Sequence, residues 1–134
     1  DIKFEYRRSN LPDDLIFLSA SFKGVKGDYI EIKKEMDRLK IEKEKNQPSK
    51  IKTGGSTFKN PVSQSKKKAW ELIKESVPLD KNFGDARISE KHCNFFVNKG
   101  HATFEDMNKL IDFVAKSVLE KTGISLEKEI KILK

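Results

Sequence analysis

The clearest periodic pattern in this chain predicts an amphipathic helix after residue 103. Its apolar positions recur at steps of three and four: Phe104, Met107, Ile111, Val114 and Val118. Thr103 and Asp106 have capping-box spacing, in which the shorter Asp replaces the usual Glu. Gly123 follows, and a glycine just beyond the final turn commonly ends a helix.

Two more helices are predicted upstream. Residues 28–45 begin with Asp28 and Glu31 at capping-box spacing and end before Pro48. The apolar stripe of this helix, in which we expect the methionine to fill the core, consists of Tyr29, Ile32, Met36 and Leu39. Residues 66–77 form the other helix, whose apolar face consists of Ala69, Trp70, Ile73 and Val77.

Strands are predicted at three places. Residues 15–22 form a short, bounded apolar run, which is typical of a buried strand, and residues 95–98 form a second one. Residues 124–133 alternate in polarity, with two acidic residues, Glu127 and Glu129, on one face and three apolar residues on the other: Leu126, Ile130 and Ile132. Interspersed helices and strands indicate an α+β (α/β-like) fold, in which about three helices pack on a small mixed sheet.

The connection between residues 46 and 65 is long for a compact domain, and long ordered connections are often functional. It contains Thr53–Pro61, where two glycines precede the hydroxyl of Ser56 and a cation and an amide follow. A turn would need only the glycines or the Asn60-Pro61 pair. Two interpretations therefore remain open: a simple loop or the wall of a polar pocket.

The net charge of +7 favours a small basic nucleic-acid or anion-binding module as an alternative function. However, only four of the 28 cations are Arg, whereas planar recognition of phosphates and bases favours the guanidinium group. The sequence contains no apolar run of the ~20 residues that a membrane span requires and no apolar leader, so we expect a soluble intracellular protein. One cysteine, Cys93, excludes an intrachain disulfide.

Several catalytic patterns are absent or weak. The glycines do not have the spacing of a phosphate-binding or dinucleotide-binding loop, and no pattern of zinc ligands occurs. Cys93 could pair with His101 as a nucleophile, although a single cysteine beside an apolar strand is usually part of the core. Ser56 is not in the Gly-x-Ser-x-Gly pattern of hydrolases, but it could act as an acid if cations such as Arg7 and Lys59 stabilised the alkoxide.

Four motifs occur along nearly the whole chain: Tyr6-Arg7-x-Ser9, Gly55-Ser56-x-Phe58-Lys59-Asn60-Pro61, Ser89-Glu90-Lys91-His92-x-Asn94-Phe95 and Leu126-Glu127-x-Glu129-Ile130. In this order they resemble the UDP-N-acetylenolpyruvoylglucosamine reductase family, in its compact type without a long insertion. The resemblance implies an oxidoreductase of peptidoglycan synthesis. With NADPH and FAD, it would reduce UDP-N-acetylglucosamine enolpyruvate to UDP-N-acetylmuramate.

The resemblance also implies roles for individual residues. Ser56 matches the family's proton donor, which quenches the enol intermediate. Arg7 and Glu129 match the pair that holds the substrate carboxylate and stabilises the charge that develops there, as electrostatic catalysis requires. Alternation in the sequence does not separate Glu127 from Glu129, and only the motif selects the second.

Further residues are implied to bind the substrate. Asn60 matches a substrate-contacting asparagine, and Tyr6 and Lys59 lie within the same motifs. His92 falls near a position that contacts the nucleotide-sugar half. The family's usual cation before the serine motif is replaced here by Asn46, so Lys45 is the expected contact to the pyrophosphate.

The family's glycine-rich flavin-binding segment has no counterpart in this chain, so the residues that bind the cofactor remain unknown. We expect residues 1–23 to be the end of a flavin-binding domain and residues 24–134 to be the substrate-binding domain. An amino-terminal flavin domain of the same protein is the expected partner. The fragment alone should be inactive, and the intact enzyme should be in the bacterial cytoplasm.

Overall fold

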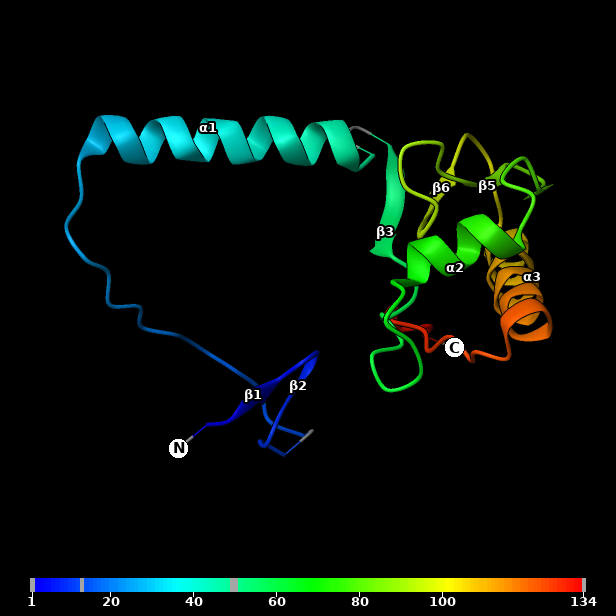
Figure 1. Ribbon diagram of the computed structural model, residues 1–134, viewed down its shortest axis with the longest axis horizontal. Helices are drawn as coiled ribbons and strands as arrows, with labels where there is room; N and C mark the ends of the chain where they lie inside the picture. Colours follow the sequence, from blue (N-terminus) through cyan, green and yellow to red (C-terminus); the bar gives the residue numbers. More distant parts are fainter. Residues whose placement is uncertain (1, 13, 49–50, 134) are drawn as a thin grey trace. The chain divides into compact units, whose positions relative to one another are not determined.

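The computed structural model describes residues 2–12, 14–48 and 51–133, which divide into two compact units, Asp1–Lys33 and Lys34–Lys134. The first unit contains a short antiparallel hairpin, in which β1 (Phe4–Glu5) pairs with β2 (Arg8–Ser9) (Figure 1). Arg7 lies in its turn with φ of 61°, a left-handed conformation that is uncommon for a residue with a side chain.

The apolar run of residues 15–22 is not a strand, and this prediction is wrong. These residues have no regular secondary structure and their side chains are exposed; Leu18 and Phe22, for example, retain 91% and 95% of their accessible surface. A buried strand needs neighbouring strands and a covering layer. The described part of the first unit supplies only the two short strands of the hairpin.

Helix α1 (Tyr29–Asn46) confirms the predicted helix and spans the division between the units. The carboxylate of Asp28 accepts hydrogen bonds from the backbone N–H groups of Ile30 (2.9 Å) and Glu31 (3.0 Å), as an N-cap does. No residue of α1 is buried, so Met36, at 60% exposure, is not the core residue that the stripe predicted. The apolar stripe is present in the sequence, but no described residue of either unit covers it.

The second unit contains a four-stranded sheet of order β3-β6-β5-β4. Its strands are β3 (Lys52–Ser56), β4 (Asn82–Phe83), β5 (Ala86–Ile88) and β6 (Phe95–Asn98). All its pairings are antiparallel, which corrects the expectation of a mixed sheet. The connections from β4 to β5 and from β5 to β6 are too short for the crossovers that parallel pairing requires.

Helices α2 (Ala69–Ser76) and α3 (Phe104–Thr122) pack together beside this sheet and share one core with it (Figure 1). The largest fully buried side chains of this core are Phe58, Leu72, Ile73, Leu110, Val97, Val114 and Val118. At α3, Thr103 and Asp106 form the predicted reciprocal cap, and Gly123 ends the helix with φ of 72°. The α+β class with three helices is therefore confirmed.

The alternating segment of residues 124–133 is not a regular strand. It makes one isolated bridge, between Lys128 and Phe58, although Leu126 is buried as its face predicted. The segment bonds to the irregular loop after β3 rather than to a full strand, and this limits the ladder that it can form. Its position beside that loop is what matters for the site.

Candidate functional site

A β-bulge in β3 leads the chain into Ser56. Thr53 pairs with Val97 and Ser56 with Phe95, so two residues of β3 oppose one of β6 between these pairs. Gly55 has φ of 85°, and among the described residues, its two chain neighbours aside, no heavy atom lies within 4 Å of the position that a Cβ would occupy there. The glycines are therefore part of a strand and form its bulge, in the left-handed conformation that glycine adopts without strain. They do not form a simple turn.

Asn94 holds the residues after Ser56, which we call the serine loop (residues 56–60), from one side. Its carbonyl accepts a hydrogen bond from the N–H of Thr57 (2.8 Å). Its side-chain amide accepts from the N–H of Phe58 (3.0 Å) and donates to the carbonyl of Phe58 (2.9 Å). The ring of Phe58 is 1% exposed and packs edge-on against Phe96, with 6.0 Å between ring centroids. The loop thus has a fixed hydrophobic base.

The segment of residues 127–129 holds the serine loop from the other side. The N–H of Glu129 donates to the carbonyl of Thr57 (2.8 Å), and the N–H of Lys59 donates to the carbonyl of Glu127 (2.9 Å). The ammonium of Lys59 pairs with the exposed carboxylate of Glu127, whereas Glu129 is half-buried. The fold therefore brings residue 129 to the neighbourhood of Ser56 and gives the two glutamates different surroundings.

Asn60 joins the serine loop to helix α2. Its side-chain oxygen accepts a hydrogen bond from the N–H of Ala69 (3.0 Å), the first residue of the helix. This bond satisfies one of the helix N-terminal N–H groups that have no partner within the helix. Asn60 therefore has a structural contact, and a role in binding substrate would add to it.

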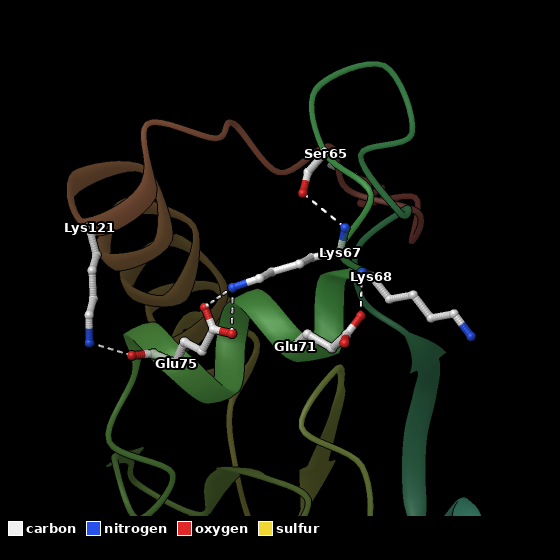
Figure 2. Close-up of polar contacts among 6 residues, drawn as sticks. All are labelled: Ser65, Lys67, Lys68, Glu71, Glu75 and Lys121. Atoms are coloured by element: carbon white, nitrogen blue, oxygen red, sulfur yellow. Dashed lines mark hydrogen bonds and ion pairs between the residues drawn. The ribbon is translucent and has the colours of Figure 1, made fainter.

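Polar contacts fix α2 and its approach, as Figure 2 shows. Beside its first turn, the carboxylate of Glu71 accepts from the N–H of Lys68 (2.7 Å), and the hydroxyl of Ser65 accepts from the N–H of Lys67 (2.9 Å). The ammonium of Lys67 reaches the carboxylate of Glu75 (2.7 Å), and Lys121 of α3 donates to the carbonyl of Glu75. These contacts fix the position of α2, the helix to which Asn60 bonds.

His92 lies at a cavity of about 390 Å³ within the second unit. The cavity has a mixed lining of charged residues of both signs, polar residues and apolar or aromatic residues: Asn46, Trp70, Lys74, Leu79, Ser89, Glu90, Lys91, His92 and Cys93. Burial lowers the pKa of His92 from its usual value, and Nδ1 accepts a hydrogen bond from the N–H of Asn94 (3.3 Å). Lys91 donates to the carbonyl of Glu44 (3.1 Å) and so ties the end of α1 to this cavity.

Cys93 has the surroundings of a structural residue. Its side chain is buried, and its thiol donates to the carbonyl of Trp70 (2.9 Å). Burial raises the pKa of the thiol, which lowers the fraction of reactive thiolate. His101 is exposed, and its backbone N–H donates to the carboxylate of Asp85. The Cys93–His101 nucleophile gains no support from this geometry.

The predicted site residues are divided between the two units. Tyr6 and Arg7 belong to the first unit, where the Arg7 guanidinium lies 5.5 Å from the centroid of the Tyr6 ring. Lys45 lies exposed in the last turn of α1, next to Asn46 at the cavity. The second unit contains the other six predicted site residues: Lys45, Ser56, Lys59, Asn60, His92 and Glu129.

Two features of the site were not predicted from the sequence. Asn94 was part of a motif without a role of its own, yet it is 4% exposed and makes three hydrogen bonds to the serine loop. A polar residue directly before an apolar strand was the available signal. Trp70, Lys74 and Lys91 come from α2 and the turn before β6, and no sequence period indicated that they line one cavity.

Two features are absent from the part of the chain that the structure describes. Within residues 2–12, 14–48 and 51–133, no three His, Cys, Asp or Glu side chains are grouped as metal ligands. Over the same ranges, no helix has the length and apolar character needed to cross a membrane.

Comparison with known proteins identifies a family. Residues 47–133 match the model of the C-terminal domain of UDP-N-acetylenolpyruvoylglucosamine reductase. A protein of that name from Pelagibacter ubique (strain HTCC1062) is 67% identical over 131 residues, and one from Rickettsia typhi is 46% identical. Each alignment covers 98% of this chain and 43% of the relative. The chain thus spans less than half the length of these relatives.

A solved structure has the same fold. The crystal structure of UDP-N-acetylenolpyruvylglucosamine reductase from Thermus caldophilus matches with a TM-score of 0.74 and 32% sequence identity. The match covers 97% of this chain and 45% of that chain. Neither comparison supports the alternative of a nucleic-acid-binding module.

Proposed function

Because this chain belongs to the UDP-N-acetylenolpyruvoylglucosamine reductase family, whose C-terminal domain it contains, we propose that it is the substrate-binding part of such a reductase. The intact protein would convert UDP-N-acetylglucosamine enolpyruvate to UDP-N-acetylmuramate for peptidoglycan synthesis in the bacterial cytoplasm. The observation that carries this proposal is the serine loop. Asn94 and residues 127–129 hold it from two sides, with Ser56 at its start.

Ser56 is the proposed proton donor. Its hydroxyl follows a bulge at which Gly55 leaves open space, so a substrate carbon can approach the loop without meeting a side chain there. A hydroxyl is a weak acid, and proton transfer therefore depends on groups that stabilise the alkoxide left behind. In the serine loop, the candidate for this is the ammonium of Lys59, which is half-buried and pairs with Glu127. The N–H groups of residues 57–59 already bond to Asn94 and Glu127.

Arg7 and Glu129 are proposed to bind the substrate carboxylate and to stabilise the charge that builds up there during the reaction. Glu129 is suited to this because its backbone bonds to Thr57, next to Ser56. For Arg7 the proposal rests on the Tyr6-Arg7-x-Ser9 motif, and within its own unit Arg7 lies in the left-handed turn of the hairpin. Tyr6 would support the guanidinium through its ring.

The cavity beside His92 is the proposed site of the nucleotide-sugar half. Lys74 and Lys91 supply positive charge for phosphates, and Trp70 supplies an aromatic surface for a base. Its volume of about 390 Å³ falls within the range of small-molecule sites. Asn60 and Lys45 would contribute contacts at the loop and at the end of α1.

FAD and NADPH are the proposed cofactors. When bound, FAD would supply the hydride and NADPH would replenish it. The open space at Gly55 fits the close approach of a flat group to the serine loop. Most of the flavin contacts are proposed to come from a flavin-binding domain of the same protein, of which residues 1–23 would be the end, with residues 24–134 as the substrate-binding domain.

Separate measurement of the two half-reactions in the full-length protein tests this proposal. Ser56→Ala should leave reduction of the flavin by NADPH unchanged. It should slow the later reoxidation by the enolpyruvyl substrate by roughly 10²–10⁴-fold, the usual contribution of a general acid. Ser63→Ala replaces an exposed serine of the same connection and should behave as wild type. A Ser56→Ala protein reoxidised at the wild-type rate would exclude the proton-donor role.

A further inference from the structure

We propose that Asn94 is a positioning residue for the reaction, which it serves by fixing the place of the Ser56 hydroxyl. This inference rests on the proposed function and extends it to a residue that does not contact the substrate. Its side chain is 4% exposed, so it is a buried polar group whose hydrogen bonds have to be made within the protein.

The bonds of Asn94 continue the β3–β6 pairing beyond the end of the sheet. The last rung of the ladder joins Ser56 to Phe95. One residue further along, the Asn94 carbonyl accepts from the N–H of Thr57 (2.8 Å). The side-chain amide then bonds both the N–H and the carbonyl of Phe58, at 3.0 and 2.9 Å, as an opposing peptide group would. An asparagine side chain has the required acceptor and donor together.

The location of these bonds explains why they act through Ser56. On its amino-terminal side, Ser56 follows the bulge, where Gly55 has φ of 85° and great conformational freedom. After Ser56, the three hydrogen bonds from Asn94 to residues 57 and 58, which we call the clamp, hold the backbone against β6. Without the clamp, the hydroxyl would move relative to a bound substrate, and displacements of about 1 Å can cost about 10²-fold in rate.

Asn98 supplies a matched control at the other end of β6. Its side chain makes the same kind of clamp: it accepts from the N–H groups of Gly100 (2.9 Å) and Ala102 (3.0 Å) and donates to the carbonyl of Ala102 (3.2 Å). That clamp holds the turn before α3 and not the serine loop. A general loss of folding stability should therefore appear in both variants, and a loss of positioning only in the Asn94 variants.

The test compares Asn94→Ala, Asn94→Asp and Asn98→Ala in the full-length protein by rapid mixing, first with NADPH and then with the enolpyruvyl substrate. Asp keeps the acceptor but loses the donor to Phe58. Both Asn94 variants should slow flavin reoxidation by about 10- to 100-fold while reduction by NADPH stays within about twofold of wild type. Asn98→Ala should leave both half-reactions within about twofold of wild type.

A double-mutant cycle shows whether Asn94 acts through Ser56. In a Ser56→Ala background, replacing Asn94 should slow reoxidation by less than about a further twofold. An equal further loss, wild-type rates in Asn94→Asp, or failure of both Asn94 variants to fold would overturn the positioning role. A wild-type protein that the substrate does not reoxidise would instead overturn the proposed function.

Discussion

The backbone N–H of Glu129 donates a hydrogen bond of 2.8 Å to the carbonyl of Thr57, which joins two segments that are far apart in the sequence. This bond places the proposed substrate-binding glutamate one residue from the proposed proton donor. The two acidic residues of this segment therefore have different surroundings, since the carboxylate of Glu127 pairs with the ammonium of Lys59.

Replacing each glutamate by glutamine should therefore have unequal effects. In the full-length protein, we expect Glu129→Gln to lower kcat/KM for the enolpyruvyl substrate by roughly 10²-fold, as loss of a group that acts in the transition state does. Glu127→Gln removes only a partly exposed ion pair, which contributes about 1 kcal/mol or less, so kcat/KM should fall by no more than about fivefold. Steady-state kinetics of the two variants side by side would decide, and equal losses would contradict the assignment.

The two glycines of the bulge should also respond differently to alanine. Gly55→Ala introduces a left-handed residue with a side chain, which costs about 1–2 kcal/mol in unfolding free energy even though the space beside it is open. At Gly54 a Cβ would lie 3.5 Å from Ile130, an ordinary contact, and φ is not positive, so Gly54→Ala should change stability by less than about 0.5 kcal/mol. Urea unfolding of both variants measures the difference. Equal midpoints would argue against the bulge.

His92 should make the stability of the chain depend on pH. Burial lowers its pKa below the usual 6.5, so the unfolded chain binds more protons than the folded chain once the pH falls through that value. The free energy of unfolding should therefore decrease from about pH 7 to about pH 5, and His92→Gln should flatten this decrease. His101→Gln, at an exposed position, should retain it. Urea unfolding across this range gives the comparison, and an unchanged slope in His92→Gln would contradict the prediction.

Trp70 is the only tryptophan of this chain, so its fluorescence reports on the cavity beside His92. Titration of the chain with UDP should change the Trp70 signal. Lys91→Met should weaken binding by roughly tenfold, because hydrogen bonds to charged groups contribute about 1.5–3 kcal/mol. Lys116→Met, at an exposed lysine of α3 paired with Glu120, is the matched control and should bind as wild type. An unchanged Trp70 signal would place the nucleotide elsewhere, and an unchanged dissociation constant in Lys91→Met would exclude the contact with Lys91.

Local chemistry determined which elements could be predicted from the sequence. Helix α3 was predicted from Thr103 to Gly123 because its cap, its apolar face and its stop signal all lie within the segment. The β4–β5 hairpin was missed, although the two-residue connection Gly84-Asp85 is a hairpin signal. The prediction of a buried strand at residues 15–22 was wrong because an apolar run shows which side chains a strand could bury, but not whether another element covers them.

The same distinction applies to the site. Ser56 and Glu129 could be singled out by their motifs, but neither the bulge at Gly55 nor the bidentate contact of Asn94 follows from a periodic pattern. These features depend on which segments meet in space. The residues that bond the serine loop are about 36 and 70 positions further along the chain, beyond the range of local sequence signals.

This separation has a consequence for protein synthesis. The serine loop leaves the ribosome well before Asn94 does, and residues 127–129 emerge only after the whole of α3. A nascent chain that has reached residue 123 carries every strand and helix of the described core, but not yet residues 127–129, which bond the serine loop from the side opposite to Asn94. The contacts of the serine loop are thus completed only after the scaffold that supports it has been translated.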